Sequence, residues 1–119
     1  MRVRAARGAI VVASDDPSTL LEATGRLLST VLERNAIEAE DLVSILFTAT
    51  EDLRSAFPAE AARRMGLGLV PLMCAREISV EGSMPRVVRL LAHFHSEAGL
   101  AGVSHVYLDG AESLRDDLD

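Results

Sequence analysis

The chain contains no lysine: all twelve of its basic residues are arginine. Without a lysine amine it cannot form a Schiff base with pyridoxal phosphate or a carbonyl substrate, and it cannot complete a P-loop. Two large classes of enzyme are thereby excluded.

Cysteine and aromatic residues are also scarce. The one cysteine, Cys74, excludes an internal disulfide and a zinc site built from cysteine alone. Aromatic residues make up only 3% of the chain and the net charge is −6, so a basic surface interleaved with aromatics for nucleic acid is not expected. An acidic protein still binds an anion where several arginines converge.

Long hydrophobic runs are missing as well. No apolar run approaches the roughly 18 residues that span a bilayer, and Ala9 to Ala13 is too short for a signal-peptide core. We therefore expect a soluble, cytoplasmic protein without a membrane partner. The hydrophobic fraction of 49% and mean hydropathy of +0.21 are high for 119 residues. They slightly favour burial against other subunits over a monomer with an Ala- and Val-rich core.

Hydrophobic periodicity, caps and turn residues predict the local structure. Asp16 and Pro17 begin a helix over 17–35 that ends at Asn35, and Gly8 marks a bulge or a close approach in the first strand. A second long helix is predicted from Ser83 to Gly99, with Met84, Val87, Val88, Leu91 and Phe94 on its apolar face. The remaining predicted elements are strands over 3–13, 42–50, 69–80 and 103–108, a short helix over 58–64 closed by Gly66, and an acidic, mobile tail over 109–119.

This order of elements predicts the fold class. We expect one α+β domain over 1–119, in which a mixed β-sheet carries its helices on one face. The other face of such a sheet needs a cover, and the assembly of several sheets around an axis supplies one.

Most of the familiar catalytic motifs are absent. On the predicted helix His93 and His95 point apart, and no third ligand lies near them, so we predict no metal site. Cys74 has no histidine placed beside it by the sequence, and His105 is expected to be an ordinary strand residue. Four other residues are more suggestive: Arg7, Glu77, Arg89 and Tyr107. Each alone is typical of a solvated face or an ion pair, but together they indicate a pocket that binds carboxylates and a hydroxyl group.

These residues carry a resemblance to a known family. The first strand, from Val3 to Ala9, resembles that of the trimeric-barrel chorismate mutases. The similarity continues in order and nearly end to end, through Ala49 to Leu53, Phe57 to Ala59, Arg63, Val70 to Cys74, Glu77, Arg89, His105 to Leu108, and Leu114-Arg115. The order and spacing of the motifs, more than any one of them, make the resemblance specific.

The resemblance implies a homotrimeric pseudo-α/β-barrel that converts chorismate to prephenate without a cofactor, with active sites between subunits. It implies that Arg7 and Tyr107 bind the side-chain carboxylate and that Arg89 reaches the ether oxygen. It also implies that Glu77 and Cys74 hold the ring hydroxyl and that Phe57 forms an apolar wall. Arg63 and Arg115 would lie at the mouth of the site, and Leu114 would help to close it. Such a rearrangement needs no acid, base or nucleophile, so a fixed guanidinium at Arg89 is the group expected to set the rate.

One spacing bears on how the site is divided. Cys74 and Glu77 are an odd number of positions apart, so a regular strand sends their side chains to opposite faces. Either a bulge lies between them, or they serve different sites of the trimer, and we favour the second. We therefore predict that one subunit supplies Phe57, Arg63 and Cys74, and that its neighbour supplies Arg7, Glu77, Arg89 and Tyr107.

Two departures from the family pattern and two alternatives remain. Glu60 stands where the family often has a basic residue, and Met73 replaces a commonly polar neighbour of the cysteine at the substrate site. Because of these two departures, a non-catalytic trimeric ligand-binding protein remains an alternative interpretation. The other alternative is a trimeric imine or enamine deaminase, whose architecture is similar and which also anchors a carboxylate with an arginine.

Overall fold

A mixed β-sheet forms the centre of the fold. In a computed structural model, which describes residues 1–118, five strands pair in the order β3-β2-β4-β1-β5. Strand β4 is antiparallel to both β1 and β2, whereas β5 runs parallel to β1 and β3 runs parallel to β2. The strand bounds are β1 Arg2–Val11, β2 Leu42–Ala49, β3 Leu72–Arg76, β4 Val87–Ser96 and β5 Val106–Leu108. The predicted mixed sheet is confirmed.

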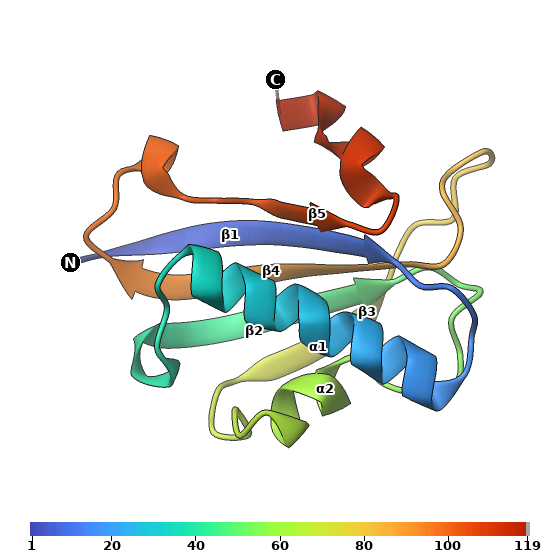
Figure 1. Ribbon diagram of the computed structural model, residues 1–119, viewed down its shortest axis with the longest axis horizontal. Helices are drawn as coiled ribbons and strands as arrows, with labels where there is room; N and C mark the ends of the chain where they lie inside the picture. Colours follow the sequence, from blue (N-terminus) through green and yellow to red (C-terminus); the bar gives the residue numbers. More distant parts are fainter. Residues whose placement is uncertain (119) are drawn as a thin grey trace.

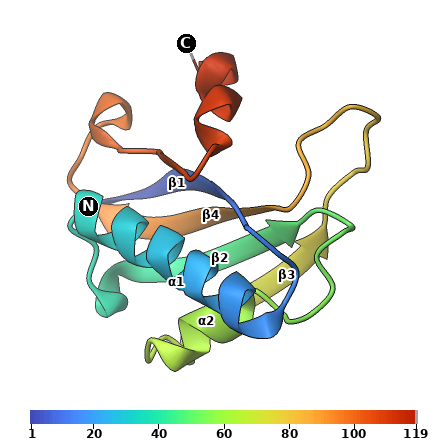
Figure 2. The same ribbon diagram turned by 45° about the vertical axis from the view of Figure 1, so that its right-hand side comes forward.

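Both helices lie on one side of this sheet, as Figures 1 and 2 show. Helix α1 (Pro17–Arg34) crosses the middle strands, and the short α2 (Ala59–Arg64) packs beside it. We call the covered side the helix face; its strand residues, among them Ala6, Ile10, Phe47, Leu90 and Phe94, form the main hydrophobic core. We call the opposite side the open face, which carries Arg7, Thr48, Arg89, Leu91 and His93. Both α-helices lie on the helix face, as predicted, and neither covers the open face.

Local capping explains why helix α1 was predictable. Asp16 Oδ1 accepts a hydrogen bond of 2.9 Å from the Thr19 N–H, and Pro17 occupies the first helical position. This backbone hydrogen bond and those from nearby hydroxyl groups hold the pKa of Asp16 well below its usual value. Asn35 caps the other end, so the observed helix matches the predicted one to within a residue.

The predicted second long helix is wrong. Residues 87–96 form strand β4, which lies between β1 and β2 in the middle of the sheet. Val88, Leu90, Ala92 and Phe94 are buried in alternation, which is the period of a strand. The same run also fits a helical period, and hydrogen bonds to partner strands on both sides decide between the two. Ser83 caps no helix; its hydroxyl donates to the Val80 carbonyl in the loop before β4.

Two other strands are shorter than predicted. Strand β3 pairs only with β2, and its ladder ends where β2 ends, at Ala49. Strand β5 begins at Val106 rather than at residue 103, because the backbone of Ser104 bonds the side chain of Asn35 instead of a neighbouring strand. Gly8 makes a close approach and no bulge: a Cβ there would lie 3.1 Å from Leu27 Cδ1 on α1.

The C-terminal segment returns to the open face. After Asp109 and Gly110, which both have positive φ, residues 111–118 form the 3-10 helix η3 (Ala111–Leu118). Ala111 is fully buried in a small cluster with Ala9 and Val87, and Leu114 packs against that cluster. The predicted mobility of the tail stays a prediction, and Asp119 lies outside the described residues. Short 3-10 turns also precede β2 (η1, Ala39–Asp41) and β5 (η2, Leu100–Gly102).

Among the described residues, no helix combines the length and the apolar character that crossing a bilayer requires.

Candidate functional site

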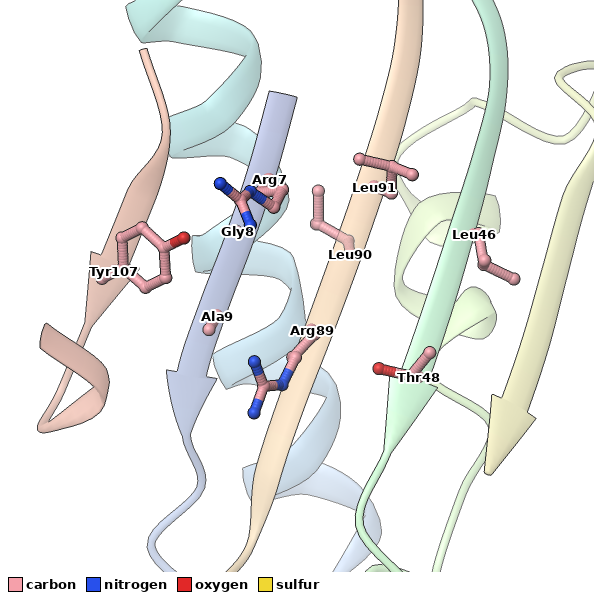
Figure 3. Close-up of a pocket in the computed structure, with 9 residues that line it drawn as sticks. All are labelled: Arg7, Gly8, Ala9, Leu46, Thr48, Arg89, Leu90, Leu91 and Tyr107. Carbon is pink, nitrogen blue, oxygen red and sulfur yellow. The ribbon is translucent and has the colours of Figure 1, made fainter. Parts of the chain in front are cut away.

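A pocket of about 190 Å³ opens on the open face of the sheet. We call it the arginine pocket (Figure 3). Strands β1, β2, β4 and β5 each contribute to it, and its side chains include Arg7, Leu46, Thr48, Arg89, Leu91 and Tyr107. Two guanidinium groups and a phenol thus meet beside an apolar floor.

Glu77 fixes one of the two arginines. The Nε atom of Arg89 lies 3.1 Å from Glu77 Oε2, and the Thr48 hydroxyl donates to the same oxygen at 2.6 Å. Thr48 stands directly opposite Arg89 in the β2–β4 register. The Arg89 side chain is 44% exposed in the isolated chain. In Figure 3 its two terminal nitrogens point toward β1.

Arg7 and Tyr107 form the opposite wall of the arginine pocket. Tyr107 pairs with Ala9 in the parallel β1–β5 register, two positions beyond Arg7. The Tyr107 hydroxyl and the Arg7 guanidinium point toward one another in Figure 3. Hydrogen-bond donors therefore face the pocket from two walls, an arrangement that suits two negative groups on one compact molecule.

Phe57 and Cys74 line a second pocket, of about 390 Å³, which we call the thiol pocket. Phe57 is 74% exposed although it is large and apolar. The loop before it is held by Arg76, whose Nη1 donates to the carbonyls of Thr50 and Leu53 at 2.6 and 3.1 Å. The thiol pocket thus has an apolar side chain at its rim, Phe57, that is largely exposed among the described residues.

The two pockets lie on opposite faces of the sheet. Cys74 is two positions from Leu72 on the same strand, so its side chain points to the same face as Leu72, which packs against the main core. Glu77, in contrast, reaches across the open face to Arg89. One chain therefore does not bring Cys74 and Glu77 into a single pocket, in agreement with the spacing. A site that uses both residues needs two copies of the chain.

The other candidate residues are more dispersed. Arg63 is exposed on α2, where its Nη1 lies 3.1 Å from Glu60 Oε1, and Glu60 also bonds Arg64. Met73 is 67% exposed and, next to Cys74 in strand β3, points to the opposite face. Leu114 and Tyr107 both pack against the small cluster around Ala111, and Arg115, next to Leu114, is exposed.

Sequence reasoning missed Thr48 and misplaced the histidines. Thr48 can be identified as a site residue only once residues 87–96 are known to form a strand. The register between β2 and β4 then places Thr48 opposite Arg89. On that strand His93 and His95 share a face instead of pointing apart, and His93 Nδ1 lies 3.2 Å from Ser44 Oγ. Across the described part of the chain no three His, Cys, Asp or Glu side chains come together as a metal site.

Comparisons with known proteins point to one family. The family model for chorismate mutase type I matches residues 3–118. Chorismate mutase AroH of Thermus thermophilus is 51% identical over 118 residues, which cover 98% of this chain and 97% of that protein. The Bacillus subtilis protein of the same name is 35% identical over 119 residues, 99% of this chain and 94% of its own. A solved chorismate mutase from Clostridium thermocellum has a TM-score of 0.91 and 40% identity, and covers 92% of this chain and 98% of its own.

Proposed function

The chain belongs to the type I chorismate mutase family, and we propose that it rearranges chorismate to prephenate in the arginine pocket. The observation that carries the proposal is the meeting of Arg7, Arg89 and Tyr107 around that pocket, with Arg89 held by Glu77. Chorismate is a compact dianion with an ether bond, so paired guanidinium groups suit both its binding and its reaction.

The rearrangement breaks a C–O bond and forms a C–C bond within one molecule. The protein must hold the substrate in a folded conformer and stabilise the negative charge that grows on the ether oxygen. In our proposal Arg7 and Tyr107 bind the side-chain carboxylate and Arg89 donates to the ether oxygen. Glu77 accepts a hydrogen bond from the ring hydroxyl of the substrate. It also binds the Nε atom of Arg89, which leaves the terminal nitrogens of Arg89 for the substrate.

We further propose that three copies of the chain form a homotrimer with shared sites. Phe57 and Cys74 lie on the face of the sheet opposite Arg7 and Arg89, so a neighbour must supply the thiol pocket that completes each arginine pocket. The open face needs a cover. The loop before β4, which extends beyond the end of the sheet in Figure 2, carries Ile78 and Val80, which are 87% and 61% exposed. Apolar side chains exposed together in this way are typical of subunit contacts.

Within this proposal the remaining candidates surround the entrance. Arg63 and Arg115 attract the ring carboxylate, Leu114 closes the site, and Met73, which points to the open face, lies near the substrate. A cytoplasmic location suits the free, exposed thiol of Cys74, which stays reduced there. The family match favours a mutase over both the deaminase and the non-catalytic binding protein.

The test is the loss of chorismate absorbance on addition of the purified protein, with prephenate identified as the product. We expect Arg89→Ala to lower kcat by at least about 10²- to 10³-fold, because one preorganised donor to a developing oxyanion contributes that much. Arg34→Ala, which removes an exposed arginine in the last turn of α1, is the matched control. Wild-type turnover in Arg89→Ala would overturn the mechanism, and no turnover by a folded wild-type trimer would overturn the function.

A further inference from the structure

A histidine side chain contacts the backbone of Arg7. The Arg7 N–H donates to Nδ1 of His105 at a distance of 3.0 Å. Residue 105 comes just before the β5 ladder, which pairs Gly8 with Val106 and Ala9 with Tyr107. The imidazole therefore takes the place of the backbone acceptor that one more ladder residue would have supplied.

The segment before His105 is held from the other side by helix α1. The Asn35 side chain, at the C-cap of α1, donates to the Ser104 carbonyl at 2.9 Å and accepts from the Ser104 N–H at 2.8 Å. Its amide nitrogen also donates to the Val31 carbonyl at 2.9 Å. Ser104 is thus clamped to the end of α1, and His105 follows in a fixed position beside β1.

We propose that His105 is a positioning residue for the arginine pocket: its neutral ring accepts the Arg7 N–H through Nδ1 and fixes where β5 starts along β1. The inference rests on the proposed function. Tyr107 is two residues beyond His105 and lies beside Arg7 only in this register. A shift at the start of β5 would therefore separate two groups that bind the same carboxylate.

The chemistry of the ring requires the neutral form for this contact, because Nδ1 of an imidazolium carries a proton and accepts nothing. Partial burial, followed by the positive charge of Arg7, lowers the pKa of His105 from its usual 6.5. Arg7 on β1 is the charged group that acts on the ring, while Ser104 and Asn35, which hold the segment to α1, do not titrate. Above pH 6.5 the contact is intact, and it is lost as the pH falls through the lowered pKa.

Two variants of His105 separate the acceptor from the rest of the side chain. In His105→Asn, Oδ1 is attached to Cγ just as Nδ1 is in histidine, so it offers an acceptor at the same place without titrating. In His105→Leu the bulk remains but the acceptor is lost. His95→Leu, at an exposed position on β4, is the matched control.

At pH 8 we expect His105→Leu to raise KM on the order of fivefold to tenfold with less change in kcat, as for the loss of a single hydrogen bond. His105→Asn should keep the wild-type KM. On acidification below pH 6.5 the wild-type KM should rise while that of His105→Asn stays level. Thermal unfolding checks that each variant is folded.

Equal KM values for the Asn and Leu variants, whether normal or raised, would overturn the proposal. A fall in the wild-type KM on acidification would also overturn it, since attraction of the substrate by the imidazolium would then outweigh positioning. Hydrogen exchange of the Arg7 amide gives a readout that needs no substrate. We expect faster exchange in His105→Leu than in His105→Asn, and equal rates would reject the contact even if the wild type rearranged no chorismate.

Discussion

Glu77, just after strand β3, and Arg89, on strand β4, meet through one oxygen: Glu77 Oε2 lies 3.1 Å from Arg89 Nε. Thr48 donates a hydrogen bond to the same oxygen. This second bond fixes the position of the Glu77 carboxylate, and the fixed carboxylate in turn orients Arg89. The glutamate thereby directs the terminal nitrogens of Arg89 to the side of the pocket where Arg7 and Tyr107 lie (Figure 3). The presence of the Glu77 carboxylate in a site for an anion is thus explained by its role in orienting the Arg89 guanidinium.

Glu77→Gln should lower kcat by about tenfold or more, because the charge-assisted hydrogen bond that fixes Arg89 is replaced by a weaker neutral one. KM should change less, since removal of a negative charge also favours a dianionic substrate. Steady-state kinetics on chorismate measure both constants. Thr48→Val, which removes only the second donor to Glu77, should have the smaller effect, and a Glu77→Gln enzyme with normal kcat would show that Glu77 does not orient Arg89.

The division of the site between two faces predicts complementation between inactive variants. Arg89→Ala removes the arginine pocket's key donor, and Phe57→Asp places a charge in the apolar thiol pocket. If each site combines the two pockets from neighbouring chains, co-refolded mixtures should contain intact sites at about a quarter of all positions, by random assortment of equal amounts. Chorismate turnover by the mixture measures them.

Each variant refolded alone is the control for that mixture, and sedimentation should show a trimer in every sample. A trimer whose mixture is no more active than its components would show that each chain builds its whole site alone.

Helix α1 and strand β4 show what the sequence can and cannot predict. The helix was predicted to within a residue because Asp16, Pro17 and Asn35 act locally on its ends. The strand was misread because Val87, Val88, Leu91 and Phe94 fit a helical period, whereas pairing with two distant strands determines the outcome. Thr48 was missed for the same reason, since only that pairing places it opposite Arg89.

The placement of Cys74 and Glu77 on opposite faces of the sheet, by contrast, could be predicted from their spacing alone. A strand alternates its side chains wherever it lies in a sheet, so this relationship needed no knowledge of partner strands. The two separate pockets follow from it. The meeting of Arg7, Arg89 and Tyr107 was not readable in this way, because three strands must come together to produce it.

Glu60→Ala should raise kcat/KM by a factor of a few at low ionic strength. Glu60 pairs with Arg63 and Arg64 on α2, and removing it restores positive charge where the proposal places the mouth of the site. The size is modest because exposed ion pairs contribute little, and the gain should vanish in high salt. Glu33→Ala, an exposed glutamate on α1, controls for net charge; equal gains in both variants would show that the position of Glu60 does not matter.

Arg26→Ala should raise KM up to about fivefold with little change in kcat, as expected for loss of an exposed ion pair that orders a closing segment. Arg26 Nη2 lies 2.6 Å from Asp109 Oδ2, at the positive-φ turn that leads into η3 and Leu114. This hydrogen bond lowers the pKa of Asp109 from its usual 3.8, so the contact is present above that pH and is lost only as the pH falls further. Glu22→Ala removes the other partner of Arg26 and leaves Asp109 in place; it should keep the wild-type KM. A normal KM in Arg26→Ala, measured at neutral pH, would mean that η3 keeps Leu114 packed against the cluster around Ala111 without this anchor.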